Sequence, residues 1–121
     1  LDRDLRLRGV DAPVYVAGQL SGTEGYCEAI ASGLMCALFV YAQLQGMQAP
    51  LLPMETVFGA LLDYATDPAT QDYQPMHVNF GILKPLDQHI RNKGMRYAAY
   101  AERGSRAMEG YVTDIRAKGL L

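Results

Sequence analysis

The chain has 121 residues, half of them hydrophobic and 20% charged, which fits one compact domain and excludes a disordered tail. Its 11 basic and 13 acidic residues give a net charge of −2, so bulk electrostatics do not favour nucleic-acid binding and any basic surface must be local. The two cysteines are too few for a disulfide framework. We therefore expect a reduced, cytoplasmic protein. Neither the cysteines nor the two histidines have the spacing of a metal site, so we expect no metal.

No uninterrupted apolar run reaches the ~18 residues that a membrane span needs, and no signal peptide opens the chain, so we expect no membrane contact. The first residue is Leu1 rather than a methionine, and a charged run follows it. We therefore expect the chain to be part of a larger protein.

The first predicted element is a short buried strand of an α/β sheet, because residues 10–17 are nearly continuously apolar after Pro13. Gly18, Gly22 and Gly25 follow and exclude a helix interior. A strand, a glycine loop and a helix in this order suit an anion or a cofactor, since glycines allow close approach and a helix start presents free N–H groups. The alternative is an ordinary strand-to-helix turn, because the spacing differs from the Rossmann dinucleotide fingerprint.

Apolar residues at steps of three and four predict three helices. The first runs from about Ala29, with Ser21 or Thr23 as its cap, and ends at Gly46. The second covers residues 56–65 and ends at Asp67–Pro68. The third covers residues 87–118, with possible breaks at Gly94 and Gly104. Residues 71–85 form an irregular stretch that is long for a passive loop and indicates a functional one.

Residues 16–29, with the sequence VAGQLSGTEGYCEA, resemble the last flavin-contacting strand and loop of a large family of tRNA-modifying FAD proteins. Further segments resemble its folate-dependent tRNA uracil-5-methyltransferase branch rather than its wobble-uridine branch: residues 59–64, 66–68, 74–76, 78–81 and 97–103. The resemblance runs from about Leu5 to Arg106.

This resemblance implies an α/β fragment that is mainly helical. Residues 1–47 would be the C-terminal piece of an FAD-binding domain, with the buried strand, the glycine loop and the long helix. Residues 48–121 would be a helical tail whose loop 71–85 faces the ligand or tRNA. The N-terminal Rossmann half, with the ADP-binding glycines and the catalytic cysteines, would be missing, so no catalytic residue is expected here, and Cys27 and Cys36 are expected to be small core residues.

The family forms 5-methyluridine in the T loop of tRNA (position 54) from 5,10-methylenetetrahydrofolate, with reduced FAD as electron donor and NAD(P)H as reductant. The expected partners are tRNA and the missing Rossmann half. Alone, the chain is expected to be inactive and, through the free edge of its strand, prone to self-association. Two alternatives stay open: a wobble-uridine carboxymethylaminomethyl-modifying FAD protein of the same superfamily, and a non-catalytic helical module that binds RNA or a partner.

The resemblance assigns the flavin cradle to seven residues: Gly18, Gln19, Gly22, Thr23, Glu24, Gly25 and Tyr26. Glu24 could instead contact the folate pterin or favour the helix dipole. For the folate or uracil pocket we expect Asn79, whose amide suits a heterocycle edge, and Phe80, which offers a stacking face or else fills the core. His77 stands where the family is expected to have asparagine and is interpreted as a solvated loop residue.

A basic cluster in the third predicted helix could contact tRNA phosphates: Arg91, Lys93, Arg96, Arg103 and Arg106. The spacing of the last three predicts one stripe, opposite the tyrosines of the same helix. The alternative is a solvated helix face, because Glu102 and Glu109 lie between the basic residues.

Overall fold

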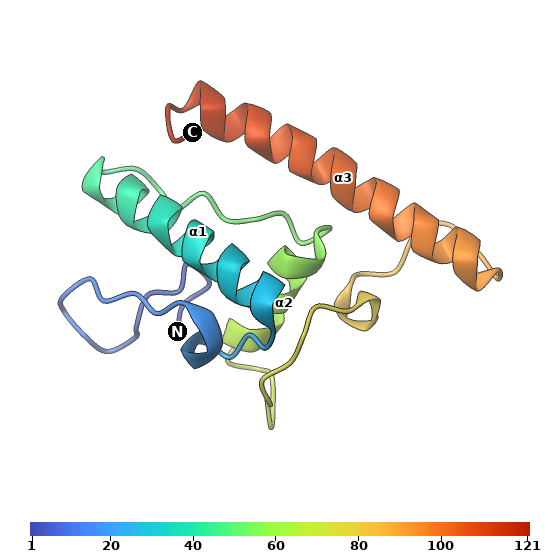
Figure 1. Cartoon of the computed structure of the whole chain (residues 1–121), viewed down its shortest axis with the longest axis horizontal. Helices are drawn as coiled ribbons and strands as arrows, with labels where there is room; N and C mark the ends of the chain where they lie inside the picture. The colour runs from blue at the N-terminus through green and yellow to red at the C-terminus, as the bar shows by residue number, and fades with distance from the viewer.

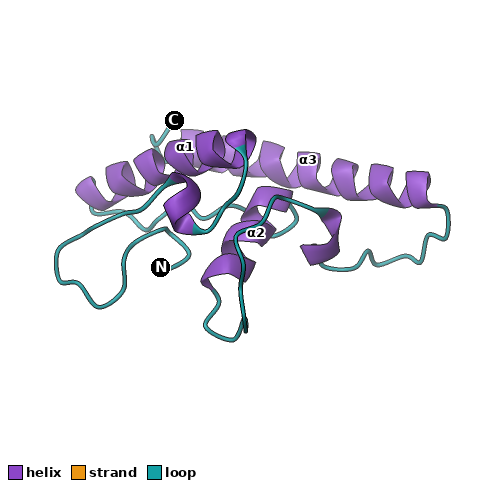
Figure 2. Ribbon diagram, turned by 60° about the horizontal axis from the view of Figure 1, so that its bottom comes forward, coloured by secondary structure: helices purple, strands orange, loops and turns teal.

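The computed structural model describes all of residues 1–121 and consists of helices and loops. It contains three α-helices, α1 (Tyr26–Leu44), α2 (Val57–Thr66) and α3 (Lys93–Ala117), and two short 3-10 helices, η1 (Gly18–Ser21) and η2 (Phe80–Ile82). The C-terminal half of α3 lies near the end of α1, and its first half extends beyond α1 and α2 (Figure 1). Figure 2 shows the same arrangement, with long loops joining the helices.

The predicted buried strand over residues 10–17 is not seen in the structure. Tyr15 forms one isolated antiparallel bridge with Arg6, and the Val16 N–H donates to the Leu5 carbonyl at 3.0 Å. Val14 remains 41% exposed. A strand interior needs neighbouring strands to accept and donate its backbone hydrogen bonds, and residues 5–7 are the only neighbours here. The mainly helical part of the predicted fold class is therefore confirmed, and its strand is not shown.

α1 starts at Tyr26, earlier than predicted, and the predicted cap is wrong. Its N-cap is Gly25, which gives no side-chain hydrogen bond. The Ser21 and Thr23 hydroxyls instead donate to the Gly18 carbonyl, at 2.7 and 3.3 Å, inside the glycine loop. The predicted stop is confirmed, because Gly46 follows the helix at a φ of 67° that favours glycine.

α2 matches its prediction within one residue. The Thr56 hydroxyl caps it by accepting a hydrogen bond from the Gly59 N–H at 3.1 Å, and Asp67 ends it before Pro68. A methyl group on Gly59 would collide with the Pro53 carbonyl, so glycine is needed at this point of the first turn.

α3 begins at Lys93, six residues later than predicted, because Asn92 caps it by accepting a hydrogen bond from the Met95 N–H at 2.9 Å. The possible breaks at Gly94 and Gly104 do not occur. A glycine in a helix interior costs only about 1 kcal/mol, which the rest of a long helix outweighs. Gly104 also allows close packing, since a Cβ there would lie 3.2 Å from the Glu55 carbonyl oxygen.

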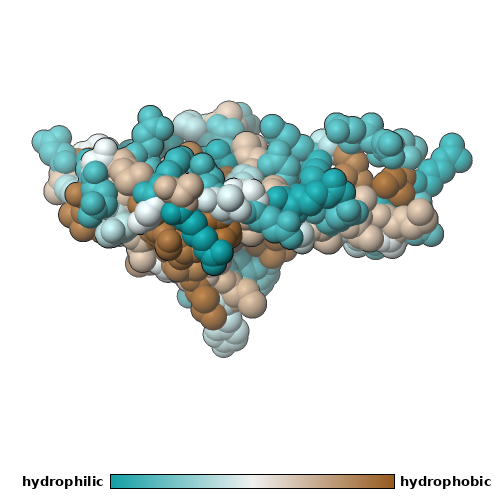
Figure 3. Space-filling model, turned by 90° about the horizontal axis from the view of Figure 1, so that it is seen from above, coloured by the Kyte–Doolittle hydropathy of each residue, from teal (hydrophilic) through white to brown (hydrophobic).

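Two apolar clusters join the helices to each other. The larger consists of Leu5, Met35, Phe39, Leu52, Phe58, Leu61 and Leu62, and the smaller of Ala42, Ile115 and Leu120. Both predicted parts of the chain, residues 1–47 and 48–121, contribute to them. Figure 3 shows hydrophilic side chains across much of one face, with apolar side chains gathered in the middle and in the part that projects below.

α1 has two unlike faces. Its inner face carries the buried residues Glu28, Ser32, Met35, Phe39 and Ala42. Its outer face, which we call the α1 outer face, carries large exposed side chains at helical spacing: Tyr26 (93% exposed), Ile30 (74%), Leu34 (60%), Tyr41 (44%) and Leu44 (77%).

Contrary to the expectation from the sequence, α1 is long and apolar enough to cross a membrane by length and composition. This alone is weak support for a span, because a core helix of a soluble protein passes the same test. On its inner face Glu28 and Ser32 make hydrogen bonds to other segments of the chain. We interpret α1 as a helix packed by protein on this face.

Candidate cofactor and ligand site

An open pocket of about 770 Å³ lies where the glycine loop meets the first turn of α1; we call it the α1 pocket. Its lining residues are Gln19, Glu24, Gly25, Tyr26, Cys27, Glu28, Ala29 and His77. Four of the seven residues assigned to the flavin cradle are among them. Small-molecule sites commonly enclose roughly 300–1,000 Å³, so this volume fits a ligand such as one ring system of a cofactor.

The other three cradle residues shape the loop and do not line the pocket. Thr23 is fully buried, and its hydroxyl is engaged inside the loop. The Gly18 N–H donates to the Ser32 hydroxyl at 2.7 Å. Gly22 has a φ of 90°, and its carbonyl accepts a hydrogen bond from the Tyr73 hydroxyl at 2.6 Å. These contacts hold the loop in one conformation around the pocket.

The start of α1 presents free donors to the pocket. The N–H groups of Tyr26 and Cys27 lie in the first turn and make no hydrogen bond within the chain. Together with the helix dipole they can stabilise an anion or the carbonyl edge of a heterocycle. Cys27 is exposed here, so the prediction that it is a core residue is wrong, whereas Cys36 is half-buried and burial raises the pKa of its thiol.

The segment from Tyr73 to Val78 forms a second wall of the pocket. Besides the Tyr73 contact, two hydrogen bonds fasten it: the Glu24 N–H donates to the Met76 carbonyl, and the Val78 N–H donates to Glu28 Oε1, both at 3.0 Å. His77 lies between these two contacts and faces the pocket, although its side chain is 68% exposed as predicted for a solvated residue.

Glu28 is a functional candidate that the sequence analysis missed. It is only 6% exposed, yet the Val78 N–H and its own N–H hold its pKa below the usual value, with His77 adding a smaller effect in the same direction. Burial alone would raise the pKa. The contact joins residues 50 positions apart, so no local pattern could have revealed it.

Asn79 and Phe80, expected at the folate or uracil pocket, lie outside the α1 pocket. The Asn79 side chain caps η2, because its Oδ1 accepts a hydrogen bond from the Gly81 N–H at 2.9 Å. The Phe80 ring packs edge-on against Tyr97, with centroids 5.0 Å apart, and lies 5.6 Å from the Tyr100 ring. Phe80 also lines a smaller pocket of about 310 Å³ between α2 and α3.

Arg96 and Arg103 do not lie opposite the tyrosines of α3, so for these two residues the predicted stripe is wrong. Arg96 lies over the Tyr97 ring at 5.7 Å, and Arg103 lies over the Tyr100 ring at 5.2 Å. Residues three or four apart are neighbours on a helix surface, which brings Arg103 onto the same side as Tyr100. The cations therefore stack on the aromatic rings.

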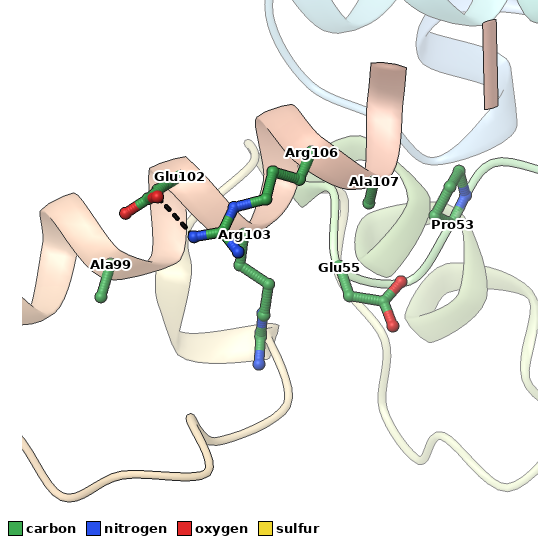
Figure 4. Close-up of a pocket in the computed structure, with 7 residues that line it drawn as sticks. All are labelled: Pro53, Glu55, Ala99, Glu102, Arg103, Arg106 and Ala107. Carbon is green, nitrogen blue, oxygen red and sulfur yellow. Dashed lines mark hydrogen bonds and ion pairs between the residues drawn. The ribbon is translucent and has the colours of Figure 1, made fainter. Parts of the chain in front are cut away.

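Arg103 and Arg106 already have partners, and Figure 4 shows the pair of Arg106 with Glu102. The Arg103 guanidinium donates to the carbonyls of Lys84 at 2.8 Å and Pro85 at 3.2 Å, and so fastens the loop before α3. Arg106 pairs with Glu102. Both line a pocket of about 560 Å³ together with Glu55 and Glu102, so the two negative charges there balance the two positive charges.

Arg91 and Lys93 are the remaining members of the basic cluster, and both are exposed. Lys93 lies over the Tyr97 ring at 5.4 Å, and the Arg91 side chain has no hydrogen bond or ion pair. No group of three or more His, Cys, Asp or Glu side chains comes together as a metal site.

This chain is similar to known proteins over most of its length. Residues 1–48 match the family described as Glucose inhibited division protein A. The protein named Methylenetetrahydrofolate--tRNA-(uracil-5-)-methyltransferase TrmFO from Thermotoga neapolitana is 43% identical over 99 residues, which cover 82% of this chain and 23% of the relative. The protein of the same name from Sphingopyxis alaskensis is 44% identical over 115 residues, 93% of this chain and 25% of the relative. The chain thus spans about a quarter of the length of these curated relatives.

Proposed function

We propose that this chain, which is TrmFO-like over most of its length, is part of a cytoplasmic folate- and FAD-dependent tRNA (uracil-5-)-methyltransferase. In that enzyme it would complete the site that binds the cofactor. The observation that carries the proposal is the α1 pocket. It lies at the glycine loop, and all of its lining residues except His77 belong to the region that matches the Glucose inhibited division protein A family. Four residues that the resemblance assigns to flavin line it together.

The residues of the α1 pocket fit the ring system of a flavin or a pterin. The Tyr26 ring is 93% exposed and free to stack, and the first N–H groups of α1 suit a carbonyl edge. Gln19 and Glu24 add an amide and a carboxylate, which are only 3.4 Å apart and can both turn to a ligand. FAD, when bound, supplies the electrons that reduce the transferred one-carbon group, and NAD(P)H restores them.

The α1 outer face supports a partner for this chain. A contiguous row of large exposed apolar side chains is unusual on an isolated soluble protein and marks a contact surface. We propose that the Rossmann half of the same enzyme covers it. Self-association of the chain through this face, or through the segment near Val14, is the alternative when that half is absent.

For the tRNA, the structure favours Arg91 and Lys93 among the five predicted contacts. They are exposed and free of ion pairs, and Tyr97 beside them is 40% exposed. Charge reversal at both positions should weaken tRNA binding at low salt and reduce its salt dependence. Charge reversal at Arg106 should have less effect, because its guanidinium is already paired with Glu102.

The test is a hybrid enzyme in which this chain replaces the matching segment of the Thermotoga neapolitana relative. We expect the hybrid to retain FAD and to form 5-methyluridine in tRNA from 5,10-methylenetetrahydrofolate and NAD(P)H. The unmodified relative is the control. The 121-residue chain alone should show no tight flavin binding in a fluorescence titration.

Other outcomes would contradict the proposal. A hybrid that binds FAD but modifies only the wobble uridine would support the other branch of the superfamily. Tight FAD binding by the chain alone would show that the glycine loop is a self-sufficient site. RNA binding by the chain without any flavin dependence in the hybrid would support a non-catalytic module.

A further inference from the structure

We infer that His77 contacts the ligand in the α1 pocket and that Glu28 is the positioning residue that holds His77 there. The inference rests on the proposed function, because it assigns the folate co-substrate, through the polar edge of its heterocycle, as the group that His77 meets. Neither residue belongs to the set that the sequence assigns to flavin, folate or tRNA.

The wall that carries His77 depends on the Glu28 side chain. Three hydrogen bonds hold residues 73–78 against the glycine loop and α1, and two of them flank His77. One of these two is donated by the Val78 N–H to Glu28 Oε1 at 3.0 Å. The Glu28 carboxylate is buried in the first turn of α1, so its position is fixed by the helix. Loss of this carboxylate would free the backbone next to His77.

The His77 ring is held at one edge and free at the other. Its Nδ1 lies 3.8 Å from Glu28 Oε1, and a Cβ built on Gly25 would lie 2.7 Å from Nδ1 and 3.1 Å from Cε1. The Nδ1–Cε1 edge therefore packs against the start of α1. The side chain makes no hydrogen bond in the structure, which leaves Nε2 free to bond a ligand.

The rest of the pocket is suited to the same ligand. The titratable groups that line it beside His77 are Glu24, Glu28, Cys27 and Tyr26. An imidazole can donate or accept one hydrogen bond at its free nitrogen, which matches a heterocycle edge that alternates ring nitrogens, carbonyl oxygens and amino groups. His77 lies beside the start of α1, and Tyr26 in the first turn offers its ring to the same pocket.

A double-mutant cycle in the hybrid enzyme tests this arrangement. His77→Ala should raise the KM for 5,10-methylenetetrahydrofolate about tenfold, as expected for one lost hydrogen bond, while kcat and FAD content stay unchanged. Glu28→Ala should raise the same KM about as much. The double variant should show about tenfold and not about a hundredfold, because both changes remove one contact.

Conservative variants separate positioning from a general loss of structure. His77→Asn keeps a donor and an acceptor and should restore most of the affinity. Glu28→Gln keeps the acceptor for the Val78 N–H and should stay near the wild-type KM. In the 121-residue chain, hydrogen exchange of the Val78 amide should accelerate in Glu28→Ala but not in Glu28→Gln. Glu109→Ala, which removes an exposed carboxylate from α3, is the matched control.

An unchanged KM in His77→Ala, or multiplying effects in the double variant, would overturn the inference. So would a Val78 amide that exchanges equally in wild type and Glu28→Ala. A wild-type hybrid that binds FAD but makes no 5-methyluridine would overturn the proposed function instead, and the exchange measurement would still decide whether Glu28 holds the wall.

Discussion

The strongest test of the α1 pocket is the substitution Gly25→Ala at the N-cap of α1. Gly25 has a φ of 110°, where a side chain is strained by about 1–3 kcal/mol. The new Cβ would also collide with Glu28 Oε2 and lie 2.7 Å from His77 Nδ1. Crowding of this kind costs about 1–3 kcal/mol more. The free energy of unfolding should therefore fall by about 2–6 kcal/mol, a large part of the ~5–15 kcal/mol of a typical domain.

Urea unfolding followed by far-ultraviolet circular dichroism measures this loss. The matched control is Gly110→Ala, because Gly110 lies in α3 with no atom near its added methyl group. There the free energy of unfolding should rise by up to about 1 kcal/mol, since alanine is the better helix former. A Gly25→Ala variant within about 0.5 kcal/mol of wild type would refute the geometry given for the pocket wall.

Three further predictions concern the core and two titrating groups. Phe39→Ala should lower the free energy of unfolding by about 3–5 kcal/mol, because Phe39 is 1% exposed in the larger cluster. Tyr111→Phe should lower it by about 1 kcal/mol, since the hydroxyl donates to the Pro50 carbonyl at 2.5 Å. Burial raises the pKa of Tyr111 from 10.0 to about 12. The stability that the protonated hydroxyl contributes is therefore complete below pH 10 and is lost as the pH rises toward 12. Over this range, the free energy of unfolding should fall less steeply in Tyr111→Phe than in wild type. The pKa of Glu28 is lowered in the folded protein, so its carboxylate contributes stability above its usual value of 4.5. This stability is lost as the pH falls through the lower folded-state pKa. In Glu28→Gln, the free energy of unfolding should therefore fall less steeply at acid pH than in wild type.

The helices could be predicted from the sequence because their signals are local. Thr56 and Asp67 enclose α2 as capping rules indicate, and Gly46 ends α1. The sequence pattern predicts a start for α3 that is six residues too early, since the apolar pattern continues through Ile90 while the cap is Asn92. The apolar run near Val14 suits a strand interior, but a strand depends on partners in space, and local periodicity does not report whether the chain contains them.

The site could be predicted only as far as the glycine loop. Its glycines and the helix that follows are adjacent in sequence, so the pocket at Gly25 and Tyr26 was within reach of motif reasoning. The second wall was not, because Glu28 and Val78 are 50 positions apart and a glutamate near a helix start normally suggests only a favourable charge. The amide of Asn79 suggests a heterocycle contact, but in the structure its oxygen is engaged as the cap of η2.

The energetics of the α1 outer face explain why a pocket on this chain would depend on a partner. Fully burying a large apolar side chain contributes about 1.5–3 kcal/mol, so covering the exposed parts of Ile30, Leu34 and Leu44 alone would contribute about 3–6 kcal/mol. That is comparable with the whole stability of a small domain. Tyr26 belongs both to this face and to the α1 pocket. A partner that covers the outer face would therefore also fix the ring that stacks on the ligand, and ligand affinity and docking should rise together.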